Sequence, residues 1–180
     1  MGALSLTPDD VVYFFATSRD GYVADANGGG KWMQGYFIPE MGFHDLLAEI
    51  RNVVMGGLIW SATQKHGQWP YGAIPGAIAA GGPVSLPGAR LQAVSGSGLA
   101  LINAAKTMAP GPTWLVGDNA LALSLARERL ITRIIHFTMP ETLSAGADRL
   151  PPDLFADFAP IDKQLYPNQV ERQSYAPRAS

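Results

Sequence analysis

The sequence predicts an α/β domain with a mostly parallel central sheet and an antiparallel edge at its C-terminal end. Short apolar runs that favour strands alternate with longer segments of helical periodicity. The first run, VVYFFAT at 11–17, is almost continuously apolar, as expected of a strand buried on both faces. Near the end of the chain, two weaker strand patterns flank YPNQ at 166–169, which predicts a terminal hairpin.

The elements of the first half follow the opening strand in order. Residues 18–32 are rich in glycine and turn-forming residues, so a mobile loop is expected there. Apolar residues at helical spacing predict a helix over 40–51. The run NVVMG at 52–56 predicts a second buried strand, and 58–67 predicts a further helix or helical turn. The apolar face of the first helix comprises Met41, Leu46, Leu47 and Ile50.

The middle of the chain continues the alternation. AIAA at 77–80 is a third strand candidate, and 86–96 holds a turn and a fourth strand. Ser97 can accept hydrogen bonds from the first turn of a helix, which the sequence PGP at 110–112 ends. The short run TWLV at 113–116 predicts a fifth strand.

The last third completes the pattern. Asp118 is expected to open a helix that runs to about Leu130, and 131–140 predicts a sixth strand. No internal repeat or linker interrupts the chain, so one domain is expected over 1–180, with its core at about 11–175.

The composition narrows the possible functions. The formal net charge is −2 and no basic stripe is present, which argues against nucleic acid and membrane surfaces as partners. There is no cysteine, and the three histidines lack the spacing of metal ligands, so no metal site is expected. Neither a long apolar segment nor a signal peptide is apparent, so a cytoplasmic location is expected.

The strand–glycine–helix junction that begins at Trp114 has the pattern of a phosphate site. Free N–H groups and the positive end of the helix dipole point outward at such a junction. The side chain after Gly117, however, is the carboxylate of Asp118, which can either cap the helix or repel a phosphate. Asn119 could donate to a phosphate or simply occupy the first turn, and Ala120 follows it in that turn.

Four segments now occur in a fixed order: ATSRDGYVA, NVVMGGLIW, QWPYGAIPG, and the long stretch from Trp114 to Leu150. Together they resemble the dihydrofolate reductase-like family, which includes the reductase domain of bifunctional riboflavin-biosynthesis proteins. The resemblance extends from about Val11 to Tyr175. Each motif alone is weak, and their order and spacing carry the specificity.

The resemblance implies a three-layer α/β sandwich with a mostly parallel central sheet. It also implies an oxidoreductase that binds NADPH along the carboxyl ends of the strands. It also implies hydride transfer to a pterin-like or pyrimidine-like small-molecule substrate, and a homodimer. The expected cofactor contacts are Gly56, Gly57, Ser95, Gly96, Gly117, Asp118, Asn119 and Ala120. For Ser95 and Gly96 an ordinary loop is the alternative, and Gly117 could serve the backbone turn without any ligand.

The chain departs from the family pattern where relatives contact phosphate. Gly57 stands where a cationic residue follows Met-Gly in relatives, and Gly81 and Gly82 stand near a second basic position. Asp118 replaces a glycine of the third phosphate motif. A glycine offers a phosphate only its N–H, whereas a guanidinium binds it through charge-assisted bonds. Weak discrimination between NADPH and NADH is therefore expected.

Three residues are candidates for the catalytic region. By resemblance, Asp20 would lie beside the substrate or nicotinamide, although an Asp-Gly turn explains it equally simply. Trp32 follows three glycines and could cover a flat ring or anchor the loop. Glu40 lies near the position of the carboxylate that pairs with the pterin in dihydrofolate reductases, and could instead be an acidic first-turn residue.

Two functions follow from these features. The first is an NAD(P)H-dependent reductase with an altered phosphate site, in which the cofactor supplies the hydride and the protein supplies orientation. The second is a non-catalytic small-molecule-binding protein on the same fold, with a degraded cofactor site.

Overall fold

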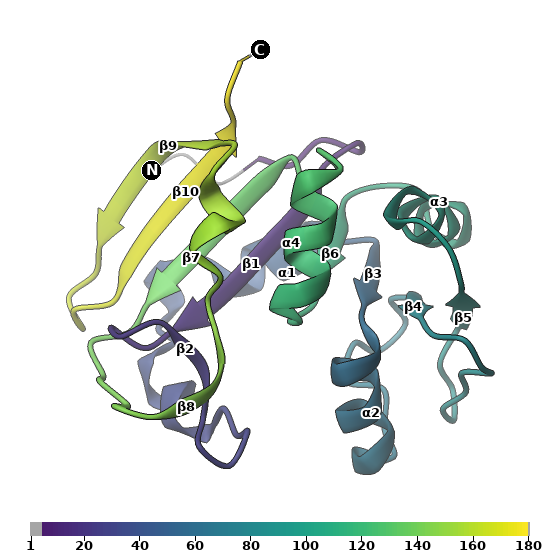
Figure 1. Ribbon diagram of the computed structural model, residues 1–180, viewed down its shortest axis with the longest axis horizontal. Helices are drawn as coiled ribbons and strands as arrows, with labels where there is room; N and C mark the ends of the chain where they lie inside the picture. Colours follow the sequence, from purple (N-terminus) through teal and green to yellow (C-terminus); the bar gives the residue numbers. More distant parts are fainter. Residues whose placement is uncertain (1–4, 180) are drawn as a thin grey trace.

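A computed structural model describes residues 5–179 and contains an eight-stranded sheet in the order β5-β4-β3-β6-β1-β7-β10-β9 (Figure 1). The strands from β5 to β7 pair in parallel, and β10 pairs antiparallel with both β7 and β9. The strands are β1 (Val11–Thr17), β3 (Asn52–Met55), β4 (Gly76–Ala79), β5 (Leu91–Val94), β6 (Thr113–Leu115), β7 (Arg133–Thr138), β9 (Phe158–Leu165) and β10 (Glu171–Pro177). The predicted fold class, with its antiparallel terminal hairpin, is confirmed.

Helices cover both faces of this sheet. The helices are α1 (Phe43–Glu49), α2 (Gly57–His66), α3 (Gly98–Met108) and α4 (Asn119–Arg127), with 3-10 turns η1 (Lys31–Tyr36), η2 (Pro39–Met41) and η3 (Pro152–Phe155). Helices α3 and α4 pack with η3 on one face of β1, and α1 packs with η1 on the other.

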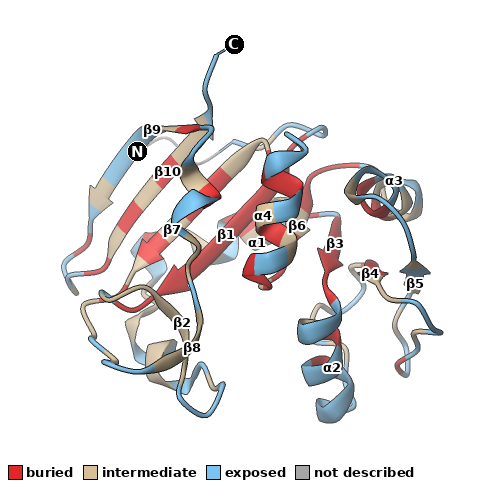
Figure 2. Cartoon of the chain, in the orientation of Figure 1, coloured by how far each residue is buried: buried red, intermediate tan, exposed pale blue. Residues whose placement is uncertain are grey.

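Strand β1 is the centre of the core. All seven of its residues are buried, as Figure 2 shows by their colour. Because side chains alternate across a strand, Tyr13 and Phe15 pack under α3 and α4, whereas Val12 and Phe14 face α1. The sequence-based reading of 11–17 as a strand buried on both faces is confirmed.

The expected loop over 18–32 is partly wrong, because it contains a strand. Strand β2 (Tyr22–Asp25) pairs antiparallel with β8 (Gly146–Arg149) and forms a separate two-stranded sheet. Its partner lies in the distant segment after β7, so no local pattern could indicate the pairing.

Two helix boundaries also differ from expectation. Helix α1 begins at Phe43 rather than at residue 40, because Gly42 adopts a left-handed conformation (φ 68°) that separates η2 from the helix. Helix α4 ends at Arg127 rather than near Leu130, and Arg129 is left-handed (φ 57°) just beyond it. In the part of the chain that the structure describes, no helix is both long and apolar enough to cross a membrane.

Candidate functional site

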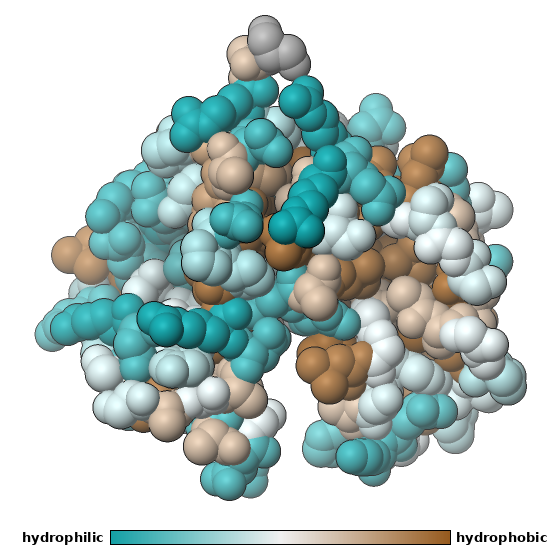
Figure 3. All heavy atoms as spheres, viewed as in Figure 1, coloured by the Kyte–Doolittle hydropathy of each residue, from teal (hydrophilic) through white to brown (hydrophobic). Residues whose placement is uncertain are grey.

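The parallel strands end together at one edge of the sheet, where open α/β sheets bind ligands. Strands β3 and β6 are neighbours, and each is followed at once by a helix, α2 and α4. In the view of Figure 3 the surface is notched at this edge, between the side that carries β2 and β8 and the side that carries α2. We call this notch the crevice.

The junction after β3 is in direct contact with the junction after β6. A Cβ atom built on Gly56 would overlap Oδ2 of Asp118 and would lie 2.7 Å from its Cγ. Only glycine therefore leaves room for this carboxylate, which is 8% exposed. The carboxylate occupies the hollow left by the missing side chain of Gly56.

Asp118 also caps α4, as the sequence predicted. Its Oδ1 accepts a hydrogen bond of 3.2 Å from the N–H of Leu121, which satisfies one free donor of the first turn. Gly117 and Asp118 are both left-handed, with φ of 54° and 61°. Left-handed backbone is readily adopted by glycine and costs free energy at most other residues, so the chain maintains an unfavourable conformation at this junction.

Asn119 faces the interior rather than the crevice surface. Its Oδ1 accepts a hydrogen bond of 2.7 Å from the hydroxyl of Tyr13, and its Nδ2 donates to the carbonyl of Asp148 at 3.5 Å. Burial raises the pKa of Tyr13, and the charges of Asp148 and Asp118 raise it further. Burial likewise raises the pKa of Asp148, with Asp118 adding to the effect. Two carboxylates thus lie close to the beginning of α4.

The glycines after β3 and β4 border open space. A Cβ atom on Gly57 would meet nothing closer than the carbonyl oxygen of Ala79 at 3.8 Å, and one on Gly81 or Gly82 would meet no atom within 4 Å. These are the three positions at or near which the family resemblance implies cations. Ser95 and Gly96 are exposed directly after β5, the outermost strand on this side.

Asp20 is engaged in holding two loops together. Its carboxylate accepts hydrogen bonds from Ser18 Oγ at 2.7 Å and from the N–H groups of Leu143 and Ser144 at 3.1 and 2.8 Å. The bond from Ser18 is the main cause that lowers the pKa of this carboxyl, and the two N–H groups lower it further. Sequence reasoning expected a turn or a ligand contact, and did not anticipate this link.

Trp32 and Glu40 lie on the α1 side of the sheet. Trp32 belongs to η1 and packs against the cluster around Phe14, and its Nε1 is buried without a partner among the described residues. Glu40 is exposed in η2, so it is not the first-turn residue of α1. The structure brings these two residues to one face of β1.

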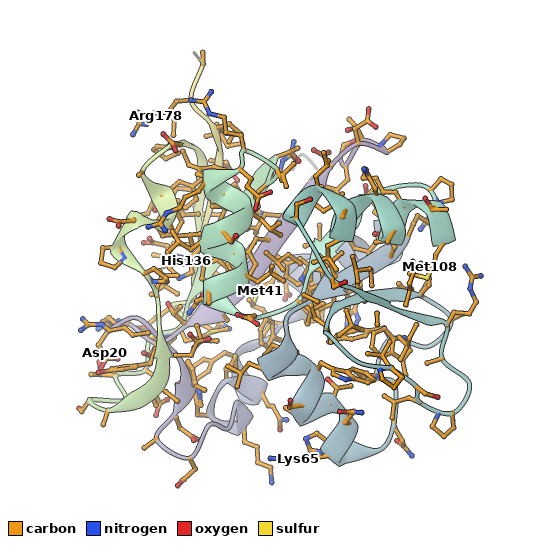
Figure 4. All side chains as sticks on the ribbon, turned by 45° about the vertical axis from the view of Figure 1, so that its right-hand side comes forward. Asp20, Met41, Lys65, Met108, His136 and Arg178 are labelled. Atoms are coloured by element: carbon orange, nitrogen blue, oxygen red, sulfur yellow. The ribbon has the colours of Figure 1, made fainter. Side chains whose placement is uncertain are left out.

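Asp20, the third catalytic candidate, lies apart from Trp32 and Glu40, because it lines a cavity on the opposite face of β1. This cavity has a volume of about 850 Å³ and lies where β1 and β7 end. His136 lines it as well, stacked on Phe15 with its Nε2 2.7 Å from the hydroxyl of Thr17. In Figure 4, Asp20 and His136 lie on the same side of the molecule. We call this hollow the β1–β7 cavity.

Burial lowers the pKa of His136 to about 4, so its ring is neutral near pH 7. Sequence reasoning did not select His136, nor Tyr13, Asp148, Arg19 and Arg149 at this edge. His136 could have been selected from the sequence because it is a polar residue within an apolar strand pattern. Among the described residues, no group of three histidine, aspartate or glutamate side chains could hold a metal ion.

Comparison with known proteins adds information about the fold. No model of a protein family matches this sequence, and neither does any curated protein. A putative riboflavin biosynthesis protein from Shewanella sp. PV-4 superposes with a TM-score of 0.73 at 20% identity, over 94% of this chain and 99% of the other.

Two further solved structures are similar. The dihydrofolate reductase of Enterococcus faecalis, solved with NADP(H), gives a TM-score of 0.68 at 12% identity over 97% of this chain and 100% of that chain. A diaminohydroxyphosphoribosylaminopyrimidine deaminase/5-amino-6-(5-phosphoribosylamino)uracil reductase from Thermotoga maritima gives a TM-score of 0.65 at 14% identity, over 94% of this chain and 56% of that one. At these identities the likeness establishes the fold.

Proposed function

We propose that this chain, which has the dihydrofolate reductase-like fold, is an NAD(P)H-dependent reductase of a small heterocyclic substrate. The observation that carries the proposal is the row of glycine junctions at the carboxyl ends of β3, β4, β5 and β6, which faces open space at Gly57, Gly81 and Gly82. The N-termini of α2 and α4 follow two of these strands and offer N–H groups suited to a diphosphate. The E. faecalis dihydrofolate reductase, which shares the fold, binds NADP(H).

Different residues of this chain would bind different parts of the dinucleotide. Ser95 and Gly96 are placed to contact an adenosine ribose, and the first turn of α2 at Gly56 and Gly57 a phosphate. The turn from Gly117 to Ala120 would hold the diphosphate. When bound, the dinucleotide supplies the hydride, while the chain supplies orientation and excludes water.

Of the three catalytic candidates, Trp32 and Glu40 would act on the α1 face of β1, and Asp20 would act on the opposite face, just after β1. The indole N–H of Trp32 is buried and has no acceptor among the described residues, so a heterocycle that reached it would satisfy this donor. Glu40 is exposed nearby in sequence and free to meet a substrate N–H. Asp20 would position the β1–β2 turn through its bonds to Leu143 and Ser144.

The glycines at 57, 81 and 82 lead to a prediction about cofactor choice. Without a guanidinium or ammonium at these positions, the 2′-phosphate gains no charge-assisted bond there. NADPH and NADH are expected to bind with dissociation constants within about fivefold of each other, which isothermal titration calorimetry can measure. A strong preference for NADPH would contradict the altered phosphate site and leave the fold assignment intact.

Removing the charge of Asp118 should strengthen dinucleotide binding. Asp118→Asn keeps a side chain that caps helices and tolerates left-handed backbone, and removes the negative charge beside the expected diphosphate. At an effective dielectric between protein and water this repulsion costs on the order of 1–2 kcal/mol, so affinity for both NADPH and NADH should rise about tenfold or more.

Asp153→Asn is the matched control for this measurement. It removes the same charge from η3, where the carboxylate is 75% exposed and far along the chain from the junction. Its dissociation constants should equal those of the wild type. If Asp118→Asn behaves like this control, the diphosphate does not lie at the start of α4.

The buried carboxylate of Asp118 also favours a second candidate function, a non-catalytic binding protein. A carboxylate packed against Gly56 would repel a phosphate at this junction. Thermal shift with NADPH, NADH, FAD and pterins separates the two functions, since a ligand at a hundred times its dissociation constant adds about 2.7 kcal/mol of apparent stability. A response to a pterin without a response to any dinucleotide would support the binding protein.

We also propose that the protein is a homodimer. Edge strand β9 has a row of backbone groups that can pair with a second chain, and it exposes Ile161 and Leu165, at 55% and 68%. Sedimentation equilibrium of the purified chain at a single monomer mass would refute this.

A further inference from the structure

The β1–β7 cavity is separate from the crevice. The cofactor candidates follow β3, β5 and β6, whereas the cavity opens on the other side of β1, at the end of β7. Its walls come from the turn after β1, from His136 and Thr138 of β7, and from the stretch 149–152. Its volume of about 850 Å³ falls within the range of roughly 300–1,000 Å³ of small-molecule sites.

Two cations border this cavity without partners of opposite charge. Arg19 extends from the turn after β1 and Arg149 ends β8, and both are exposed. Neither forms an ion pair with a residue that the structure describes. The guanidinium of Arg149 lies over the ring of Tyr22, 5.6 Å from its centroid, which limits where it can reach.

The carboxylate that lines the cavity forms no ion pair with these cations. Asp20 is the one acidic residue among the described lining residues, and its oxygens already accept three hydrogen bonds. The wall therefore carries two guanidinium groups against one engaged carboxylate. A guanidinium prefers an oxyanion, which it binds through paired, charge-assisted hydrogen bonds.

The remaining lining residues suit an apolar or aromatic group attached to that oxyanion. Leu150, Pro151 and Pro152 form an apolar wall, and His136, whose ring is uncharged near pH 7, also lines the cavity. The hydroxyl of Thr138 makes no hydrogen bond with the described residues, so it is free to bind a ligand.

We propose that the β1–β7 cavity binds a small aromatic or heterocyclic oxyanion, a phosphate monoester or a carboxylate. Arg19 and Arg149 hold the anionic group, and the ring lies against His136 and the prolines. None of the expected dinucleotide contacts lines the cavity. Of the reductase candidates Asp20 does, and its carboxylate there accepts hydrogen bonds from Leu143 and Ser144.

Titration of the whole protein with phenyl phosphate, benzoate, inorganic phosphate and phenol tests this site, with the amide chemical shifts as the readout. Phenyl phosphate or benzoate should bind more tightly than phenol and inorganic phosphate. The shifts should move at Ser18–Gly21 and Arg149–Leu150 and not at Gly117–Ala120. The tighter of the two anions identifies the source as a phosphate monoester or a carboxylate.

The arginines provide the decisive variants. Arg19→Gln and Arg149→Gln should each weaken binding of the tighter anion about tenfold, the loss expected for one charge-assisted contact. Arg178→Gln is the matched control and should bind as the wild type does, because Arg178 does not line the cavity and lies well above Asp20 in Figure 4. Unfolding temperatures show whether each variant is folded.

Several results would overturn the proposal. Phenol binding as tightly as the anions would show an apolar hollow without anion recognition. Inorganic phosphate binding as tightly as phenyl phosphate would show that the ring contributes nothing. Unchanged affinity in both arginine variants, or shifts confined to Gly117–Ala120, would place the anion elsewhere.

Discussion

Gly56→Ala is expected to destabilise the protein by about 2 to 3 kcal/mol. The new methyl group would overlap the carboxylate of Asp118, whose Cγ lies 2.7 Å from the Cβ position. Moving that carboxylate breaks its hydrogen bond to Leu121 at the start of α4. Overpacking costs about 1 to 3 kcal/mol and a lost cap about 1 kcal/mol, and urea unfolding measures the total.

Gly57→Ala is the matched control, because the nearest atom to its new methyl group would be 3.8 Å away. It should leave stability unchanged or raise it slightly. Asp118→Gly should remove most of the cost of Gly56→Ala, so a double-mutant cycle should show strong coupling between the two sites. Additive effects would mean that the two side chains do not compete for one space.

His136 should make the protein less stable as the solution becomes acidic. Burial lowers the pKa of this imidazole from 6.5 to about 4, so the unfolded chain binds a proton more readily than the folded chain. The stabilising effect is complete above the unfolded pKa and is lost as the pH falls from about 6.5 towards 4. A difference of this size is worth roughly 3 kcal/mol.

The measurement is urea unfolding at about pH 7.5 and about pH 4.5, compared with His136→Gln. The wild type should lose about 2 to 3 kcal/mol more than the variant over this interval, because only the wild type has this group to protonate. Thr17→Val keeps the imidazole and removes its hydrogen-bond partner, so it should keep the pH dependence at a lower overall stability. Equal pH dependence in wild type and His136→Gln would refute the neutral buried ring.

Elements governed by local chemistry could be predicted from the sequence. The run 11–17 is apolar throughout and is the buried centre of the sheet. Ser97 and Asp118 were expected as helix caps, and each accepts a hydrogen bond from the first turn of its helix. These features depend on residues a few positions apart, which a sequence displays directly.

Features that depend on packing between distant segments could not be predicted. Gly56 and Asp118 were both selected as cofactor candidates, but their contact arises only because β3 and β6 are neighbours. Arg19 and Arg149 come together only through the pairing of β2 with β8. The short, partly exposed strand β2 gave no pattern that separates it from a loop.

The hydrogen bonds between the turn after β1 and the segment after β7 limit how these two loops can move. Asp20 accepts hydrogen bonds from the N–H groups of Leu143 and Ser144, and β2 pairs with β8 in the same region. Neither segment can move away alone without breaking these bonds, so the two loops are expected to open together, with one shared free energy of opening. A ligand that requires one loop to move would therefore have to displace both.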